Sequence, residues 1–220
     1  MSLNRQHPFW GSLSPLGGLT GASLLIMASA RLSWAIVVSG CLLWVYGLSA
    51  LTVISLTSFF GMKVFPKNGR KALYVCIASF WSTLYILLFW LLCPLAALEV
   101  FMLLLLVPLF FTGSNIIEHL SSMMDKYHYD NFEYLSEALV QAAVLAALTL
   151  VFSIIREPLF YCSWTLPGTY KGMITVISFK EGSFFPIEIF SASAGALILL
   201  GYIICLYQFA KSYISAHGDN

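Results

Sequence analysis

The feature that most constrains this chain is a series of long stretches without a single charged residue. No Asp, Glu, Lys or Arg occurs within 32–62, 72–98 or 100–117. About 20 consecutive apolar residues cross the hydrocarbon core of a bilayer, and an ionised side chain at its centre costs about 3 kcal/mol or more. Hydrophobic residues make up 60% of the 220 positions and charged residues only 10%. The sequence therefore predicts an all-α integral membrane protein.

The charged residues mark the ends of six predicted spans, which cover residues 9–29, 34–61, 72–93, 96–117, 134–155 and 186–210. We expect the first span to be retained, because Pro15-Leu16-Gly17-Gly18 interrupts it and Arg5 is the only cation before it, unlike a cleavable signal peptide. The whole chain, 1–220, is then one membrane domain. A net charge of +1 without a basic tract excludes nucleic acid as a partner.

Basic residues predict the orientation of the spans. Lys63, Lys67, Arg70 and Lys71 lie in the short connection between the second and third spans, which the positive-inside rule places in the cytoplasm. With six spans, both termini are then cytoplasmic. Seven of the 11 Lys and Arg residues fall on the inner side by this assignment and four on the outer side, namely Arg31, Arg156, Lys171 and Lys180.

Two short interruptions occur at matching places in the two halves of the chain. The first is Gly11-Ser12-Leu13-Ser14-Pro15-Leu16-Gly17-Gly18, and the second runs from Val107-Pro108 through Thr112-Gly113-Ser114-Asn115. Membrane helices tolerate such breaks where the freed backbone is buried in protein or lines a site. Three spans per half predict a 3+3 inverted repeat, 9–93 and 96–212, whose broken first and fourth helices meet near the midplane from opposite faces.

Several strings, in order along nearly the whole chain, resemble those of a known family. Gly11 to Leu16 is similar to its Gly-Leu-Cys-Pro-Leu string, and Val107 to Ser114 is similar to its Pro-Leu-Ile-x-Thr-Asn-Cys string. Ile155-Arg156-Glu157 resembles its Ile-Arg-Glu string, and Ala194 to Gly201 resembles its Pro-Gly-Ala-Phe-Ile-x-x-Gly string. The chain thus resembles the paired membrane subunits of the bacterial Rnf and Nqr ion-translocating electron-transport complexes. Within that pair it is closer to the Rnf E/Nqr D type than to the Rnf A/Nqr E type.

The resemblance implies a cofactor site that this chain has altered. In the family, each broken helix supplies one cysteine at mid-membrane, and two related subunits together hold a [2Fe-2S] cluster with four thiolates. Ser14 and Ser114 stand at those positions here, beside Pro15 and Gly113. A serine hydroxyl is a poor substitute for a thiolate. We therefore expect the cluster to be absent or held differently.

The five cysteines give little support for another metal site. Their spacings match no iron–sulfur or zinc signature, and most are expected to be small apolar residues. Cys93 is the one alternative ligand, because Leu92-Cys93-Pro94-Leu95 reproduces the family's Leu-Cys-Pro-Leu string. The competing interpretation is that Pro94 simply ends the third span.

Acidic residues near the spans are candidates for an ion path. Glu118 follows the second interruption, and Glu99 lies near the start of the fourth span, where it either lines a path or sits in the outer interface.

Arg156-Glu157 is interpreted as an ion pair at a helix end or as a docking point for a neighbouring subunit. The long connection 156–185 is expected to be irregular because of its prolines and glycines, with aromatic residues at the outer interface.

Two functions remain open at this stage. The first is a non-catalytic subunit of a complex that couples electron flow to Na⁺ or H⁺ movement in the bacterial inner membrane, beside a homologous six-helix partner. The second is a small stand-alone transporter or channel-like protein with its site at the two broken helices. No catalytic triad, P-loop or dinucleotide-binding motif occurs in the sequence.

Overall fold

The computed structural model describes residues 23–60, 67–113, 131–169, 172–178, 195–199, 201, 202, 205 and 209. Its main elements are the helices α2 (Leu32–Phe60), α3 (Lys67–Leu92), α4 (Pro94–Gly113) and α6 (Asn131–Tyr161), followed by strands β1 (Ser163–Pro167) and β2 (Met173–Ser178). Residues 23–28 are helical and precede α2. The predicted second, third and fifth spans are each found as a long helix.

Three helices of the described part are long and apolar enough to cross a membrane: Leu32–Leu56, Ala72–Leu92 and Ala138–Tyr161. Large apolar side chains cover their outward surfaces, and Phe80, Leu91 and Val151 are more than half exposed. Such surfaces are stable in lipid and unfavourable in water. The chain is therefore a largely helical protein suited to a membrane.

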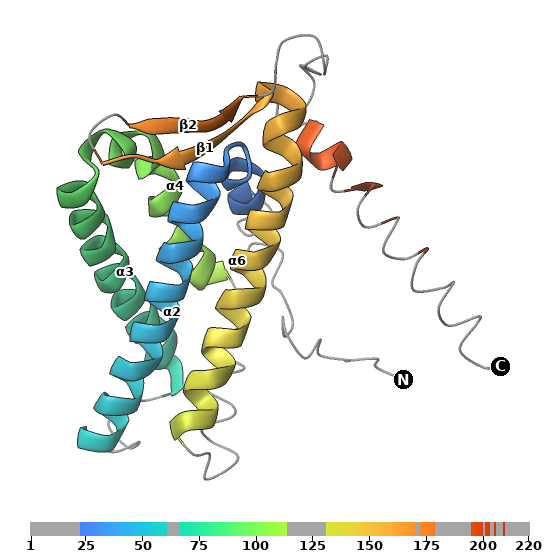
Figure 1. Cartoon of the computed structure of the whole chain (residues 1–220). Coiled ribbons are helices and arrows are strands. Elements are labelled where there is room, and N and C mark those ends of the chain that lie inside the picture. Colours follow the sequence, from blue (N-terminus) through green and yellow to red (C-terminus); the bar gives the residue numbers. More distant parts are fainter. Residues whose placement is uncertain are drawn as a thin grey trace.

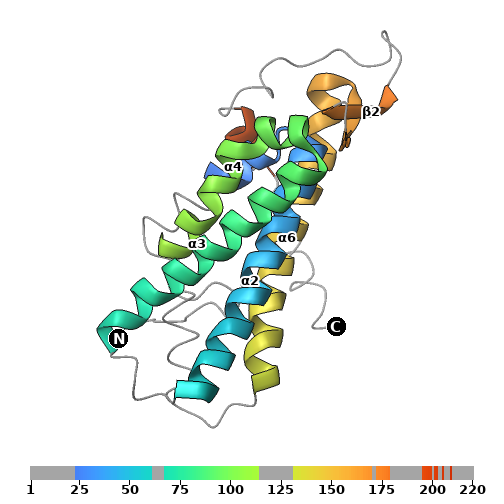
Figure 2. The ribbon, with the colours of Figure 1, turned by 90° about the vertical axis from the view of Figure 1, so that its left-hand side faces the viewer.

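Helix α2 lies at the centre of the bundle (Figures 1 and 2). It packs most extensively against the antiparallel α6 and also contacts α3, α4 and β1. The starts of α2 and α4 and the ends of α3 and α6 lie at the end of the bundle that carries the two strands, here called the hairpin end. The end of α2 and the start of α6 lie at the opposite end (Figure 1).

Small residues allow α2 to approach its neighbours closely. A Cβ atom on Gly40 would lie 2.8 Å from the Tyr85 hydroxyl of α3, and one on Gly47 would lie 3.2 Å from Leu139 of α6. The Tyr85 hydroxyl donates a hydrogen bond to the Val37 carbonyl at 3.0 Å. Close approach and interhelical hydrogen bonds hold membrane helices together, because lipid removes the hydrophobic drive for association.

Helices α3 and α4 are separated by Cys93 alone. The Cys93 N–H donates to the Phe89 carbonyl at 2.8 Å, and the Cys93 carbonyl accepts from the Ala97 N–H at 2.9 Å. Cys93 thus caps both helices, and Pro94 occupies the first position of α4, where its missing N–H is not needed. The interpretation of Pro94 as a helix terminator is confirmed.

The predicted interruption is not found at Val107-Pro108. Helix α4 continues through Pro108 to Gly113, the last residue described before residue 131. Proline lacks the N–H that would bond the carbonyl four residues earlier, here that of Leu104. The Ser82 hydroxyl of α3 donates to this carbonyl at 3.5 Å, so the helix passes the proline without leaving a buried carbonyl unpaired. Residues 114 and 115 lie outside the described part.

The connection after the fifth span is also more regular than predicted. Helix α6 continues through Pro158 to Tyr161, and the Ile154 carbonyl that Pro158 cannot bond accepts a hydrogen bond from the Trp164 indole N–H at 3.4 Å. Strands β1 and β2 then form an antiparallel pair, with Ser163 opposite Ser178 and Pro167 opposite Met173. This short hairpin is an addition to a described part that is otherwise mostly helical, as the sequence predicted.

The hairpin crosses the end of the bundle (Figure 1). Strand β1 packs on α2 and α6, while Gly172 at the turn lies beside Leu95 and Glu99 of α4. Gly172 has a φ of 72°, a left-handed conformation that glycine adopts at little cost. Its carbonyl accepts from the Gly168 N–H at 2.7 Å, which closes the turn.

Two of the six predicted spans fall mostly outside the described part. The first predicted span, 9–29, is described from residue 23 onward, and the sixth, 186–210, is described only at a few helical positions from 195 onward. Six spans and the inverted repeat of 9–93 and 96–212 therefore stay predictions.

Candidate functional site

The residues predicted to form the midplane site are mostly outside the described part of the chain. This holds for Ser14, Pro15, Ser114 and Glu118, while Gly113 is the last residue of α4. The structure therefore neither joins nor separates the two predicted ligand loops. Glu99 and Cys93, which it does describe, both lie at the hairpin end.

Glu99 lies on the second turn of α4 and is half exposed. One of its carboxylate oxygens lies 3.9 Å from the guanidinium of Arg31, which precedes α2. The same guanidinium stacks over the Tyr161 ring, 4.8 Å from its centroid, and over Trp34 at 5.6 Å. A long, half-exposed ion pair among aromatic rings is typical of the interface of a membrane protein. The interfacial interpretation of Glu99 is therefore favoured over an ion path.

Arg156 and Glu157, in contrast, are buried. Arg156 is 3% exposed and Glu157 is fully enclosed, although both lie in the apolar span that ends at Tyr161. Charged side chains are almost never fully buried without partners, and in membrane spans they usually mark functional positions. This pair is the strongest candidate site among the described residues.

Arg156 binds the end of the helical residues 23–28. Its guanidinium donates to the Ile26 carbonyl and to the Ser29 hydroxyl, which itself donates to the Ile26 carbonyl at 3.1 Å. The Ile26 carbonyl is available to Arg156 because the Ala30 N–H, which would bond it in a continuing helix, bonds the Met27 carbonyl instead. A cation at the carbonyl end of a helix is favoured by the helix dipole.

Glu157 binds the start of the next helix, α2. One carboxylate oxygen accepts from the Leu32 N–H at 2.8 Å, and the other accepts from the Thr165 hydroxyl of β1 at 2.6 Å. Leu32 is the first residue of α2, so its N–H has no partner within the helix. Arg156 and Glu157 thus hold the two helix ends on either side of Ser29-Ala30-Arg31, each with the charge that the helix dipole favours.

The contacts of Glu157 continue into a short chain of hydroxyl groups. The Thr165 and Ser33 hydroxyl oxygens lie 3.0 Å apart, and both residues are buried. An ionised Glu157 takes the only hydrogen of the Thr165 hydroxyl, so Ser33 then donates to Thr165. Four side-chain oxygens from α6, β1 and α2 therefore lie together at the hairpin end.

The sequence analysis assigned Arg156-Glu157 a structural or docking role and did not single out Ser33 or Thr165. The signal that could have found them is the position of Glu157: an acid inside the apolar run of α6, four residues after Ser153. The partners Ser33 and Thr165 have no such signal, because only the tertiary structure brings the hairpin onto the start of α2.

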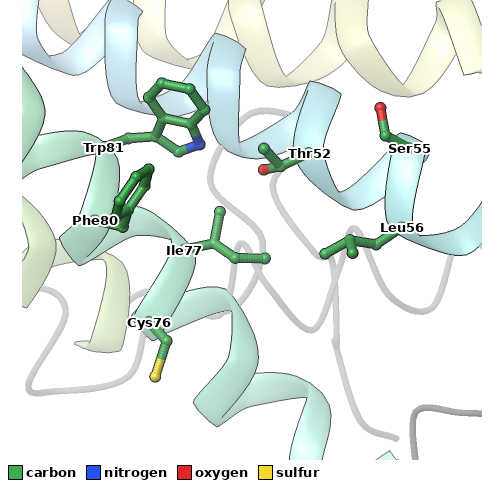
Figure 3. Close-up of a pocket in the computed structure, with 7 residues that line it drawn as sticks. All are labelled: Thr52, Ser55, Leu56, Cys76, Ile77, Phe80 and Trp81. Atoms are coloured by element: carbon green, nitrogen blue, oxygen red, sulfur yellow. The ribbon is translucent and has the colours of Figure 1, made fainter.

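A second feature, an apolar groove of about 420 Å³, lies between α2 and α3 (Figure 3). Its only hydroxyl groups, those of Thr52 and Ser55, donate to carbonyls of their own helix, at Leu48, Ser49 and Leu51. A ligand site needs a few convergent polar groups to orient its ligand. Among the described residues, the indole N–H of Trp81 is the one buried N–H or O–H group of the lining without a hydrogen-bond partner. A single donor does not make a convergent polar set, so the groove is suited to acyl chains or a neighbouring helix. Its lining residues are Thr52, Ser55, Leu56, Cys76, Ile77, Phe80 and Trp81.

The donor set for an iron–sulfur cluster does not fit. The positions matching the family's ligands carry serine, and within the described ranges no three His, Cys, Asp or Glu side chains come close enough to hold a metal ion. The cysteines are free and lie apart: Cys41 is buried in α2, Cys76 and Cys205 are exposed, and Cys93 and Cys162 are half-buried.

Comparisons with known proteins add no identity. No protein-family model matches the sequence, and neither a curated protein nor a solved structure matches it.

Proposed function

We propose that this chain is a membrane subunit of an electron-transport complex of the Rnf/Nqr type, in which electron flow on other subunits is coupled to movement of Na⁺ or H⁺. Its own role is to hold part of the membrane passage. It binds a homologous six-helix subunit in a bacterial inner membrane, and it contributes no thiolate to a shared [2Fe-2S] cluster.

The observation that carries this proposal is the position of the Ile155-Arg156-Glu157 string. This string is one of the resemblances to the family, and it holds the buried charges of the described bundle. Its two charged residues bind the backbone on both sides of the turn before α2. The string that resembles the family's therefore carries two charged residues that lie inside a candidate membrane span and bind backbone groups there.

Purification of the tagged, full-length chain from its native membrane in a mild detergent tests the proposal. We expect a six-span partner and flavin-bearing subunits to co-purify, and an equally tagged, unrelated inner-membrane protein to recover neither. Recovery of a homodimer alone, active in liposomes without other subunits, would contradict the proposal and favour the stand-alone transporter.

Electron paramagnetic resonance of the reduced complex tests the assignment of the cluster. Because Cys93 caps two helices, we expect the Cys93→Ala variant to keep any [2Fe-2S] signal that the complex shows. Loss of the signal in this variant, with retention in Ser14→Ala, would make Cys93 a ligand.

A further inference from the structure

The carboxylate of Glu157 is buried, and the donors that bond it in the described part of the chain are neutral. They are the Leu32 N–H and the Thr165 hydroxyl. Of the described cations nearby, Arg156 donates to Ile26 and Ser29, and Arg31 pairs with Glu99. A buried carboxylate in a membrane span is costly unless a cation accompanies it.

Glu157 is also the last member of a polar row along α6. Residues 141, 145, 149, 153 and 157 form one i, i+4 ridge of the helix, and four of the five are polar. They are Gln141, Thr149, Ser153 and Glu157, all at most 7% exposed, with Leu145 as the single apolar member. A buried polar row through an apolar bundle is not explained by packing, because each polar group costs free energy unless it is bonded.

Two members of this row have polar atoms without a partner. The hydroxyl oxygen of Ser153, one turn from Glu157, and the side-chain carbonyl oxygen of Gln141 are both buried, and neither has a hydrogen-bond partner among the described residues. Thr149, between them, bonds Ser39 of α2 at 3.0 Å. Unpartnered buried oxygens in proteins commonly bind water or an ion.

The donor set at Glu157 suits one small monovalent cation. A carboxylate and neutral hydroxyl groups are hard oxygen ligands, and a single carboxylate supplies one negative charge, whereas divalent cations such as Ca²⁺ usually take several. The hydroxyl chain accommodates a proton equally well. When Glu157 is protonated, it donates to Thr165 and Thr165 donates to Ser33, so that no hydrogen bond is lost.

We propose that Glu157, together with the hydroxyl groups of Thr165 and Ser33, binds one monovalent cation, Na⁺ or H⁺, beneath strand β1. Strand β1 covers this site through Thr165, next to the register irregularity between Trp164 and Thr165. The polar row of α6 continues from the site toward the bundle centre. The binding of this cation is independent of the proposed function. Its role as the coupling ion rests on the proposed function.

Thermal unfolding of the purified full-length chain in detergent tests the binding of Na⁺. The midpoint is measured in NaCl and in choline chloride at equal ionic strength, because a ligand that binds only the folded state raises its stability. We expect a higher midpoint in NaCl for the wild type, no difference in Glu157→Gln, and a reduced difference in Thr165→Val and Ser33→Ala. Thr83→Val is the matched control, because the exposed Thr83 hydroxyl bonds only its own helix.

Infrared spectroscopy distinguishes the proton from Na⁺. If NaCl has no effect on the wild type, we expect its spectrum to contain the carbonyl stretch of a protonated, buried carboxylic acid that is missing in Glu157→Gln. Absence of both the Na⁺ effect and this band overturns the proposal and leaves Glu157 as a helix cap only. If Glu157→Gln does not fold, the two hydroxyl variants Thr165→Val and Ser33→Ala provide the test. A Na⁺ effect or a protonated-acid band that is the same in both variants as in the wild type overturns the proposal.

These measurements use the isolated chain and so separate the two proposals. If the chain binds the cation but no subunits co-purify, the cation site is supported and the electron-transport complex is contradicted. If subunits co-purify but the cation does not bind, the complex is supported and the cation site is contradicted.

Discussion

Arg156 and Glu157 are adjacent in the sequence, yet they bind different helix ends. Arg156 contacts the carbonyl end of residues 23–28, and Glu157 contacts the amide end of α2. Each charge therefore stabilises a backbone group that neither water nor lipid could satisfy at that depth. At the scale of single residues, the buried charges of this protein hold a turn between two helices in place.

We expect Arg156→Met to lower the free energy of unfolding by about 2–3 kcal/mol, because charge-assisted hydrogen bonds are lost and the Ile26 carbonyl remains buried. Arg31→Met is the matched control. Its half-exposed pair with Glu99 and its ring contacts are worth about 1 kcal/mol or less. Unfolding in mixed micelles measures both changes, and equal losses would contradict the assigned role of Arg156.

At the scale of elements, two prolines lie inside helices without breaking them. In each case another element donates to the carbonyl that the proline cannot bond: Ser82 of α3 to Leu104, and Trp164 of β1 to Ile154. The helices thus depend on their neighbours at these points.

This dependence predicts a specific coupling between Ser82 and Pro108. We expect Ser82→Ala to destabilise the protein by about 1 kcal/mol, since the Leu104 carbonyl loses its donor. In a Pro108→Ala background the restored N–H bonds that carbonyl, so Ser82→Ala should cost clearly less, and only its contact with the Cys41 thiol is still lost. A double-mutant cycle measures this coupling.

Thr83→Ala serves as the control for this cycle, because the exposed Thr83 hydroxyl bonds its own helix at Ser79. Equal effects of Ser82→Ala with and without Pro108 would show that the hydroxyl does not serve the Leu104 carbonyl.

The hairpin turn makes a second prediction at this scale. A Cβ atom on Gly168 would lie 2.5 Å from Ile174 and 2.8 Å from the Gly172 carbonyl. We expect Gly168→Ala to destabilise the hairpin by about 1–3 kcal/mol through overpacking. Gly201→Ala, which meets no atom within 4 Å, should be neutral. A change in Trp164 fluorescence in Gly168→Ala but not in Gly201→Ala would show that the hairpin is disturbed. The same fluorescence and stability in both variants would contradict the described turn.

At the scale of the whole molecule, the described helices place the two kinds of connection at opposite ends. The end of α2 and the start of α6 lie at one end, and the hairpin lies at the other (Figure 1). With the positive-inside rule, this predicts that the hairpin end faces the side of the membrane opposite the cytoplasm.

Labelling with a membrane-impermeant thiol reagent tests this orientation in a background without the native cysteines. We expect Thr169→Cys to react in intact spheroplasts and Lys63→Cys to react only in inverted vesicles. Reaction of both positions from the same side, or the reverse pattern, would refute the orientation.

The sequence by itself determined the class of protein and the long helices, because charge-free apolar stretches have no stable alternative to spanning a bilayer as helices. It also located Cys93-Pro94 as a helix boundary, since a proline effect is local. It could not show that α4 and α6 pass their prolines, because the compensating donors Ser82 and Trp164 come from other elements. Nor could it join Glu157 to Thr165 and Ser33. That site exists only because the hairpin folds back onto the start of α2, a long-range contact for which no local pattern in the sequence provides a signal.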